Sequence, residues 1–370
     1  MLKKLLLCLF IFVMQIFPSF GQDVKFINAD GFFSIGTASH RTASVHLFDL
    51  DKDGDLDALV ANGRHWAEPN FVFYNDGKGG FKIAQQIGTL YYASYAMKAG
   101  DLNQDGFIDL AVINDKVPNQ LFFGTKEGTF EEKGSFGGTY GSRDLDVVDI
   151  DADGDLDLII SNRFAPNEIC LNDGKGKFDE VISFGSEDEQ SISTEVIDIN
   201  KDGRLDLITA ERQSKNKIYL NKGNLTFEAI EFGREDEDTR DLAIADFNND
   251  GYLDIVAANL ASENVIYWGG ESLTFIEEKL SESKRNSSSI AAADLNADGY
   301  IDLVEGNSED YNYVYLGSKE GKFTEVQLSE ELAEDTYKIT LGDLNGDSYL
   351  EIIEANSQNM NLYYRTVVKK

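Results

Sequence analysis

Residues 49–57 read DLDKDGDLD, and closely related strings recur along the chain. The shared pattern has Asp first, Asp or Asn third, Asp fifth, Gly or Ser sixth, Leu or Ile eighth, and Asp or Glu ninth. It starts at seven places: Asp49, Asp101, Asp149, Asp198, Asp246, Asp294 and Asp343. Successive starts lie 48 to 52 residues apart, which indicates one unit repeated along the chain.

Each unit has the pattern of four short strands. Apolar stretches precede and follow the acidic string, as at 242–245 and 255–257, and an aromatic stretch and a glycine-rich turn come later, as at 218–220 and 172–176. These stretches are too short for independent helices, and glycine supplies the positive φ of tight hairpins. Four strands in one such unit are typical of a propeller blade. The sequence therefore predicts an all-β fold, a seven-bladed β-propeller of four-stranded blades.

The two ends of the chain complement each other. The last unit stops after a third strand at 361–364, while residues 28–33 match the turn and fourth strand of the other units. We expect the N-terminal strand to pair with the last blade and close the ring, because this removes an exposed strand edge.

The first 21 residues have the layout of a secretory signal peptide. Lys3 and Lys4 precede an apolar run at 5–14, and residues 19–21 fit a cleavage site. The run is too short for a permanent membrane span, and no later stretch is long enough for one. We predict a signal peptide at 1–21, a single propeller domain at 22–370, and a secreted protein that is periplasmic or on the cell surface.

Composition narrows the function further. The net charge of −33 repels phosphate backbones and argues against nucleic-acid binding. Cys8 lies in the predicted signal peptide, which leaves Cys170 without a partner for an intramolecular disulfide. We expect Cys170 to be a small buried apolar residue.

The acidic strings are predicted to bind Ca²⁺. Side-chain oxygens at positions 1, 3, 5 and 9 and a backbone carbonyl at position 7 converge on one point, and glycine at position 6 permits the sharp bend. An EF-hand would need flanking helices and Glu at position 12, but only Glu305 and Glu354 meet the second requirement, inside strand patterns. Solvated acidic loops without metal are the other alternative. Seven strings at the same place in the repeat disfavour this metal-free alternative, because three or four carboxylates in one loop repel one another.

The predicted ligands occupy the same five positions in every string. Position 1 is Asp49, Asp101, Asp149, Asp198, Asp246, Asp294 and Asp343. Position 3 is Asp51, Asn103, Asp151, Asn200, Asn248, Asn296 and Asn345. Position 5 is Asp53, Asp105, Asp153, Asp202, Asp250, Asp298 and Asp347. Position 7 is Asp55, Phe107, Asp155, Arg204, Tyr252, Tyr300 and Tyr349. Position 9 is Asp57, Asp109, Asp157, Asp206, Asp254, Asp302 and Glu351. We expect up to seven Ca²⁺ ions, with the last site weakest because Ser348 replaces glycine and Glu351 replaces aspartate.

The strings, their spacing and the strand pattern resemble the FG-GAP/VCBS repeat family, whose calcium-loop blades also occur in the integrin alpha-chain head. The resemblance covers all seven units. It implies a seven-bladed propeller with Ca²⁺ in the loop between the first and second strands of each blade. Family members include adhesion modules, carbohydrate-binding domains and propellers attached to secreted enzymes, so the resemblance leaves the ligand open.

One face of the predicted propeller departs from the repeat. The loop between the second and third strands of the first unit, residues 62–70, is three residues longer than its equivalent at 114–119 and holds Trp66. Exposed aromatic rings beside basic side chains suit a sugar, especially an acidic one, although Trp66 packing only against its own loop is the plainer alternative. The candidate ligand-binding residues are His40, Arg41, Arg64, His65, Trp66, Tyr91 and Tyr92.

A Ser or Thr stands seven residues before each string: Thr42, Ser94, Ser142, Ser191, Thr239, Ser287 and Thr336. We expect these hydroxyls to satisfy backbone groups at strand ends. The residues beside them that can line the mouth of a central channel are Tyr95, Arg143, Arg240 and Tyr337. A structural role is favoured here too, with Arg143 pairing with Asp144 and Arg240 with Asp241.

The sequence favours a binding or adhesion module, for carbohydrate or a surface protein, over an enzyme. It has neither a G-x-S-x-G nor an H-E-x-x-H motif, and its only histidines are His40, His46 and His65, of which His46 is expected on an inner strand. The alternative is a polysaccharide lyase or hydrolase acting on acidic glycans, with its site at the His40, His65 and Tyr91 face. A purely structural spacer is a third hypothesis.

Overall fold

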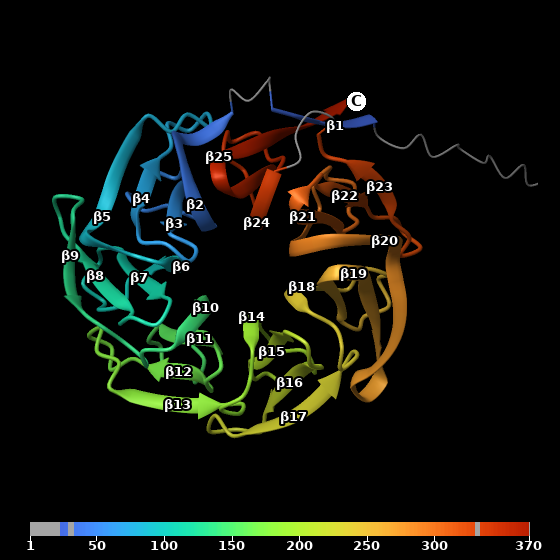
Figure 1. Cartoon of the computed structure of the whole chain (residues 1–370), viewed down its shortest axis with the longest axis horizontal. Helices are drawn as coiled ribbons and strands as arrows, with labels where there is room; N and C mark the ends of the chain where they lie inside the picture. The colour runs from blue at the N-terminus through green and yellow to red at the C-terminus, as the bar shows by residue number, and fades with distance from the viewer. Residues whose placement is uncertain (1–22, 29–32, 330–333, 370) are drawn as a thin grey trace, which may run out of the picture.

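The computed structural model describes residues 23–28, 33–329 and 334–369, and this part of the chain is almost entirely β-structure. A single 3-10 turn, η1 (Glu271–Leu273), interrupts it. Figure 1 shows the strand groups arranged around a common centre, with the first strand of each group innermost. The predicted all-β, propeller-like architecture is therefore present. The predicted signal peptide at 1–21 lies outside the described residues.

Three separate four-stranded antiparallel sheets follow one another in the middle of the chain. The first contains β6 (Ser94–Gly100), β7 (Asp109–Asn114), β8 (Gln120–Gly124) and β9 (Phe130–Gly134). The second contains β10 (Gly141–Val148), β11 (Asp157–Arg163), β12 (Asn167–Leu171) and β13 (Glu180–Phe184). The third contains β14 (Ser191–Ile197), β15 (Asp206–Glu211), β16 (Asn216–Asn221) and β17 (Phe227–Phe232). In each sheet the acidic string joins the first strand to the second, as predicted.

The other strands connect into one larger sheet, because several long strands pair with two neighbouring groups. One group contains β2 (Ser34–Phe48), β3 (Asp57–Asn62), β4 (Glu68–Tyr74) and β5 (Ile83–Tyr92). The next strands in this larger sheet are β18 (Thr239–Ala245), β19 (Asp254–Gly270), β20 (Thr274–Ala293), β21 (Asp302–Asp310), β22 (Tyr313–Leu316) and β23 (Thr324–Gln327). The last strands are β24 (Glu334–Gly342) and β25 (Glu351–Lys369).

The N-terminal segment pairs with the C-terminal strand, as the sequence predicted. Ser34 and Ile35 of β2 lie opposite Leu362 and Asn361 of β25. The paired strand thus begins at Ser34, one residue after the predicted segment, of which residues 29–32 lie outside the described part of the chain. A further short strand, β1 (Asp23–Ile27), pairs with residues 365–369 and was not predicted. Together these pairings cover the edge of β25.

Apolar clusters fill the space between neighbouring strand groups. Leu158 of β11 packs in one cluster with Ile113 of β7, and Val60 of β3 packs in another with Ile353 of β25. The second strand of each group lies between two neighbours, and β3, β7 and β15 are buried along their whole length. Cys170 is a free, buried residue of the first of these clusters, as predicted.

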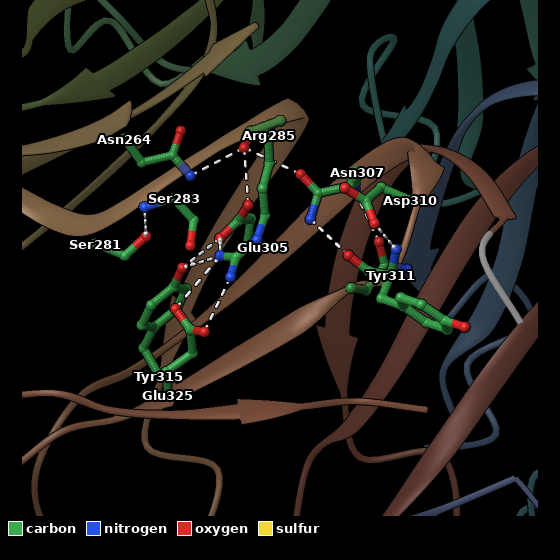
Figure 2. A network of polar contacts seen from close by, with 12 residues as sticks. Asn264, Ser281, Ser283, Arg285, Glu305, Asn307, Asp310, Tyr311, Tyr315 and Glu325 are labelled. Carbon is green, nitrogen blue, oxygen red and sulfur yellow. Dashed lines mark hydrogen bonds and ion pairs between the residues drawn. The ribbon is translucent and has the colours of Figure 1, made fainter. Parts of the chain in front are cut away.

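The predicted hydroxyls hold the second-to-third-strand loops in place. Ser94 Oγ donates to Asn114 Oδ1 at 2.7 Å and accepts from Asn70 Nδ2 of the preceding group at 2.8 Å. Ser287 makes the same two contacts with Asn307 and Asn264, which Figure 2 shows beside the ion pair of Arg285 with Glu325. These side chains are buried and hydrogen-bonded, which confirms a structural role for the hydroxyls. The expected backbone partners are wrong: the hydroxyls bind asparagine side chains, and the asparagines in turn bind backbone groups, as Asn114 does at Pro118.

Candidate functional site

Each acidic string folds into a tight loop between the first and second strands of its group. In the loop of residues 49–57, the Gly54 N–H donates to Asp49 Oδ2 at 3.1 Å, and the Asp55 N–H donates to Asp53 Oδ1 at 3.0 Å. Lys52 and Gly54 have φ values of 62° and 96°, so the chain passes through left-handed backbone twice within three residues. This geometry is the reason for glycine at position 6.

The last aspartate of the string is buried and fastens the loop to the third strand. Asp57 is 1% exposed and accepts the N–H groups of Leu50 at 3.1 Å and Asn75 at 2.9 Å. The same pair of backbone contacts recurs at Asp109, Asp157, Asp206, Asp254 and Asp302. The sequence analysis assigned position 9 to metal alone and missed this structural role. Each oxygen still keeps a lone pair that can face a cation.

The loops of the first and third units bring several carboxylates to one point. Ligand oxygens of Asp49, Asp51 and Asp57 lie within 4.8 Å of one another, and Asp149, Asp151 and Asp153 form a similar group. Asp49 Oδ1 is buried and has no hydrogen-bond partner in the described part of the chain. Burial, and next the charge of Asp53, raise the pKa of Asp51. Clustered hard oxygens with an unsatisfied buried atom fit a calcium ion.

Four other loops have Asn at position 3 and keep the same backbone scaffold. Asn200 Oδ1 accepts the Asp202 N–H at 2.9 Å, and Asn200 Nδ2 donates to Asp202 Oδ2 at 3.1 Å. The loops at 246–254 and 294–302 repeat both contacts. These loops therefore present one amide oxygen and three carboxylates.

The loop at 343–351 is built differently. Its glycine is at position 4, and Ser348 adopts a φ of 73° at position 6, where the other loops have glycine. The Asn345 Nδ2 donates to Glu351 Oε1, so the position 3 amide hydrogens face the last carboxylate. In the loops at 198–206, 246–254 and 294–302 the corresponding amide donates to position 5 instead, so the last loop differs in which ligand carboxylate the amide binds.

Two side chains of the extended loop, Arg64 and His65, reach the centre of the face opposite the acidic loops. Arg64 Nη1 lies 3.0 Å from Asp335 Oδ2, and its guanidinium stacks 4.3 Å from the Tyr337 ring centroid. His65 Nδ1 lies 3.0 Å from the Tyr95 hydroxyl. Burial, and next the charge of Arg64, lower the pKa of His65, which keeps this imidazole neutral near pH 7.

The remaining candidate ligand residues lie on the rim of that face. His40 Nδ1 and Arg41 Nη1 both contact Glu68, at 3.2 and 3.1 Å, so neither is a free donor. Trp66 is 64% exposed, with the Arg41 guanidinium 5.4 Å from its ring centroid. The other two are Tyr91, which is exposed, and Tyr92, which pairs with Glu68 across β4 and β5.

A cavity of about 290 Å³ occupies the centre of this face. Its walls include the residue that follows each of the seven hydroxyls: Ala43, Tyr95, Arg143, Ile192, Arg240, Ser288 and Tyr337. The prediction that Tyr95, Arg143, Arg240 and Tyr337 line the mouth of a channel is confirmed.

The predicted ion pairs between neighbouring residues in this wall are wrong. Arg143 pairs with Asp115 at 2.9 Å instead of Asp144, and Arg240 pairs with Asp238 at 2.7 Å instead of Asp241. Successive side chains on a strand diverge, so each arginine meets a carboxylate on a neighbouring loop more easily than the one beside it.

A second cavity, of about 380 Å³, shares Asp144 and Lys338 with the first and continues along the inner strands. Lys338 Nζ binds both oxygens of Asp241, at 2.8 and 3.0 Å. His46 lines this cavity from β2, the inner strand where it was expected, and burial lowers its pKa to about 3. The sequence analysis missed this cluster, although charged residues two positions after several of the hydroxyls were a readable signal.

Comparison with known proteins agrees with the loops and the strand pairing. The model of the FG-GAP-like repeat family matches six overlapping segments, at 49–112, 101–160, 149–209, 198–257, 246–305 and 294–354. No curated protein matches the sequence.

Several solved structures have a similar fold at low sequence identity. BBS1N in complex with ARL6DN is 13% identical, with a TM-score of 0.59, over 90% of this chain and 93% of that one. Saccharomyces cerevisiae Sqt1 is 11% identical, with a TM-score of 0.58, over 85% of this chain and 81% of that one. Chaetomium thermophilum Raptor is 10% identical, with a TM-score of 0.59, over 94% of this chain and 29% of that one. These similarities concern the fold alone.

Within the described ranges, no helix has the length and apolar character needed to cross a membrane. The family match runs from residue 49 to residue 354, which is most of the chain, and each matched segment begins at an acidic loop. On this evidence the chain belongs to the family of FG-GAP-like repeat proteins.

Proposed function

We propose that this chain is a secreted, calcium-stabilised, seven-bladed propeller that acts as a non-catalytic binding module for carbohydrate or a surface protein. The observation that carries the proposal is the central cavity, whose wall takes one residue from beside each of the seven hydroxyls. The one extended loop adds Arg64 to this wall and leaves Trp66, two residues further along the loop, exposed. A concave site with a few convergent polar groups is a common form of ligand site.

Three observations support seven closed blades. Seven acidic strings provide six overlapping family segments, because each matched segment extends from one string through the next. Seven apolar clusters separate the strand groups, and one of them joins the last group to the first through Ile353 and Val60. The N-terminal pairing of β2 with β25 lies on the same junction.

Calcium would be held by the side chains at positions 1, 3, 5 and 9 and by the carbonyl at position 7 of each loop. When bound, it would neutralise the clustered carboxylates and link the first two strands of a blade. An ion that binds only the folded state adds to stability by an amount that grows with the logarithm of the ratio of its free concentration to its Kd. Secretion rests on the signal-peptide pattern of residues 1–21.

Glycan-array binding tests the proposal. We expect wild-type protein with Ca²⁺ to bind a defined set of glycans and Trp66→Ala to lose that binding. The matched control is Ile276→Ala, which removes another exposed apolar side chain, on the outer part of β20. Undiminished glycan binding by Trp66→Ala would exclude this site, and a pull-down that captures a surface protein instead would favour the protein ligand.

A second candidate function is eliminative cleavage of acidic glycans, which the contact between His65 and the Tyr95 hydroxyl favours. A neutral imidazole and a phenol within hydrogen-bond distance can serve as base and acid. Of the predicted catalytic face, only His65 belongs to this contact, since His40 binds Glu68 and Tyr91 lies on the rim. Incubation with a panel of polyuronates, followed by ultraviolet absorbance of an unsaturated product, tests it. A flat absorbance trace across the panel would eliminate the lyase hypothesis.

A further inference from the structure

Arginines gather at one place in this acidic protein. The chain has a net charge of −33 and ten arginines, and five of them lie at the central cavity or the loops around it: Arg64, Arg143, Arg163, Arg212 and Arg240. Arg64, Arg143 and Arg240 line the cavity itself. Burial, and then the positive charges of Arg212 and Arg143, lower the pKa of Arg163, so these three guanidinium groups lie within electrostatic range of one another.

Carboxylates on the same loops balance only part of this charge. Arg64 pairs with Asp335, and Arg143 pairs with Asp115. Arg212 and Arg240 share one carboxylate, Asp238, at 3.1 and 2.7 Å from their Nε atoms. Three aspartates therefore serve four arginines. The carboxylates that line the cavity itself are Asp144, Glu309 and Asp241, of which Asp241 is bound by Lys338.

Arg163 is the fifth arginine, and within residues 23–28, 33–329 and 334–369 it has no ion-pair partner. Its Nε is buried without a hydrogen bond, and its guanidinium lies 5.1 Å from the ring centroid of Phe164. Phe164 is 61% exposed and has a φ of 57°. A cation beside other cations, held by an exposed ring instead of a carboxylate, would gain stability from an anion.

The deeper part of the channel offers no comparable opening for an anion. Lys338 binds Asp241, whose oxygens also accept hydrogen bonds from Ser193 and Ser289 at 3.1 and 2.8 Å. Asp144 lines both cavities, and burial raises the pKa of Glu195 to about 8, so Glu195 is largely uncharged near pH 7. Lys338 therefore has a carboxylate partner, whereas Arg163, at the end of β11, has no ion-pair partner among the described residues.

We propose that the arginine-rich side of this mouth binds the carboxylate of a uronic acid at the end of an acidic glycan, with Arg163 as its direct ion-pair partner. The inference rests on the proposed function and names the ligand class of that site. A volume of about 290 Å³ is at the small end for ligand pockets and suits a single sugar ring. The exposed rings of Trp66 and Phe164 provide faces on which further sugars can stack, and this favours a glycan over an acidic peptide.

Calorimetric titration with three probes tests the assignment: tri-galacturonate, its fully methyl-esterified and therefore uncharged form, and a hexa-aspartate peptide. We expect wild type to bind tri-galacturonate more tightly than the ester. Arg163→Gln should weaken tri-galacturonate binding roughly 10- to 100-fold and leave the ester unchanged, because only the charged group loses its partner. Arg163→Lys should retain part of the affinity, since it keeps the charge without the planar fork.

The matched control is Arg365→Gln, whose affinity should equal that of wild type. Arg365 also has a buried Nε without a hydrogen bond and stacks on an aromatic ring, Phe33 at 4.5 Å, but it contacts the Lys78 carbonyl near an acidic loop. A melting curve for each variant separates lost binding from lost folding.

The outcomes distinguish this inference from the function on which it rests. Equal affinity for the acid and the ester, or unchanged affinity in Arg163→Gln, overturns the anion site, while continued sensitivity to Trp66→Ala leaves the binding module in place. Binding of hexa-aspartate in preference to tri-galacturonate overturns the uronic-acid assignment. Failure of wild type to bind any carbohydrate on the array overturns the inference together with the carbohydrate function.

Discussion

The repeat is regular on one face of the molecule and irregular on the other. On one face, all seven acidic loops share the hydrogen bond that the position 6 N–H donates to position 1, even where Ser348 replaces glycine in the last loop. On the other face lie Arg64 in an extended loop, Arg163, which has no ion-pair partner in the described part of the chain, and Glu211 where other units have asparagine. The regular face therefore serves the scaffold, and the irregular face is the one on which we propose the ligand site.

The difference between the two faces rests first on calcium binding to the acidic loops of the regular face. Chelation with EDTA is expected to lower the melting temperature by more than about 10 °C, because several ions that bind only the folded state are removed together. Calorimetry with and without Ca²⁺ measures the shift, and adding excess Ca²⁺ back should restore it. Identical melting curves with and without Ca²⁺ would show that calcium does not stabilise the acidic loops.

Within that face, the third loop should depend on calcium more than the last. Asp151→Ala is expected to remove about 2–3 kcal/mol of calcium-dependent stability, because Asp151 belongs to a converging group of carboxylates. Asn345→Ala is expected to remove less than about 1 kcal/mol, because its amide already faces Glu351. Urea unfolding at matched Ca²⁺ concentrations compares the two variants. Equal losses would contradict the ranking of the sites.

On the irregular face, Glu211 should make stability depend on pH. Burial raises its pKa from 4.5 to about 7, against the opposing hydrogen bond from Ser191. Between these two values the folded state keeps a proton that the unfolded chain has lost. The contribution of Glu211 to the free energy of unfolding is therefore present below pH 4.5 and is lost as the pH rises to about 7.

Glu211→Asn, which copies the residue found in the other units, should raise stability by about 1–3 kcal/mol at pH 8 and change it little at pH 4. Urea unfolding at the two pH values, with Ca²⁺ present at both, checks this. A gain of the same size at pH 4 would show that packing, and not the buried charge, is the cause.

The smallest expected effect concerns the backbone of the last loop. Ser348→Gly should stabilise the calcium-free protein by about 0.5–1 kcal/mol, because it relieves a left-handed backbone at a residue with a Cβ atom. The reverse change, Gly54→Ser, should destabilise by a similar amount. If both substitutions were neutral in urea unfolding without Ca²⁺, backbone strain would not distinguish the last loop from the others.

Much of the scaffold could be predicted because it repeats. The acidic strings, the buried strands beside them and the hydroxyls seven residues upstream each have one local environment, copied with the unit. The pairing of residues 34–35 with 361–362 was also predictable, because the two ends together complete one unit. The backbone contacts of Asp57 were not, since they join positions 7 and 18 residues away that no motif connects.

Sequence alone determined the strand pattern, the periodic acidic loops and the location of the irregular face, because these follow from residue spacing and backbone conformation. Only the tertiary structure decided which charges meet at the cavity. Arg64 binds Asp335, which is 271 residues away, and Arg143 binds Asp115 instead of its neighbour Asp144. Such partners come from adjacent strand groups packed around one centre, and ion pairs require short distances in space that chain spacing does not specify.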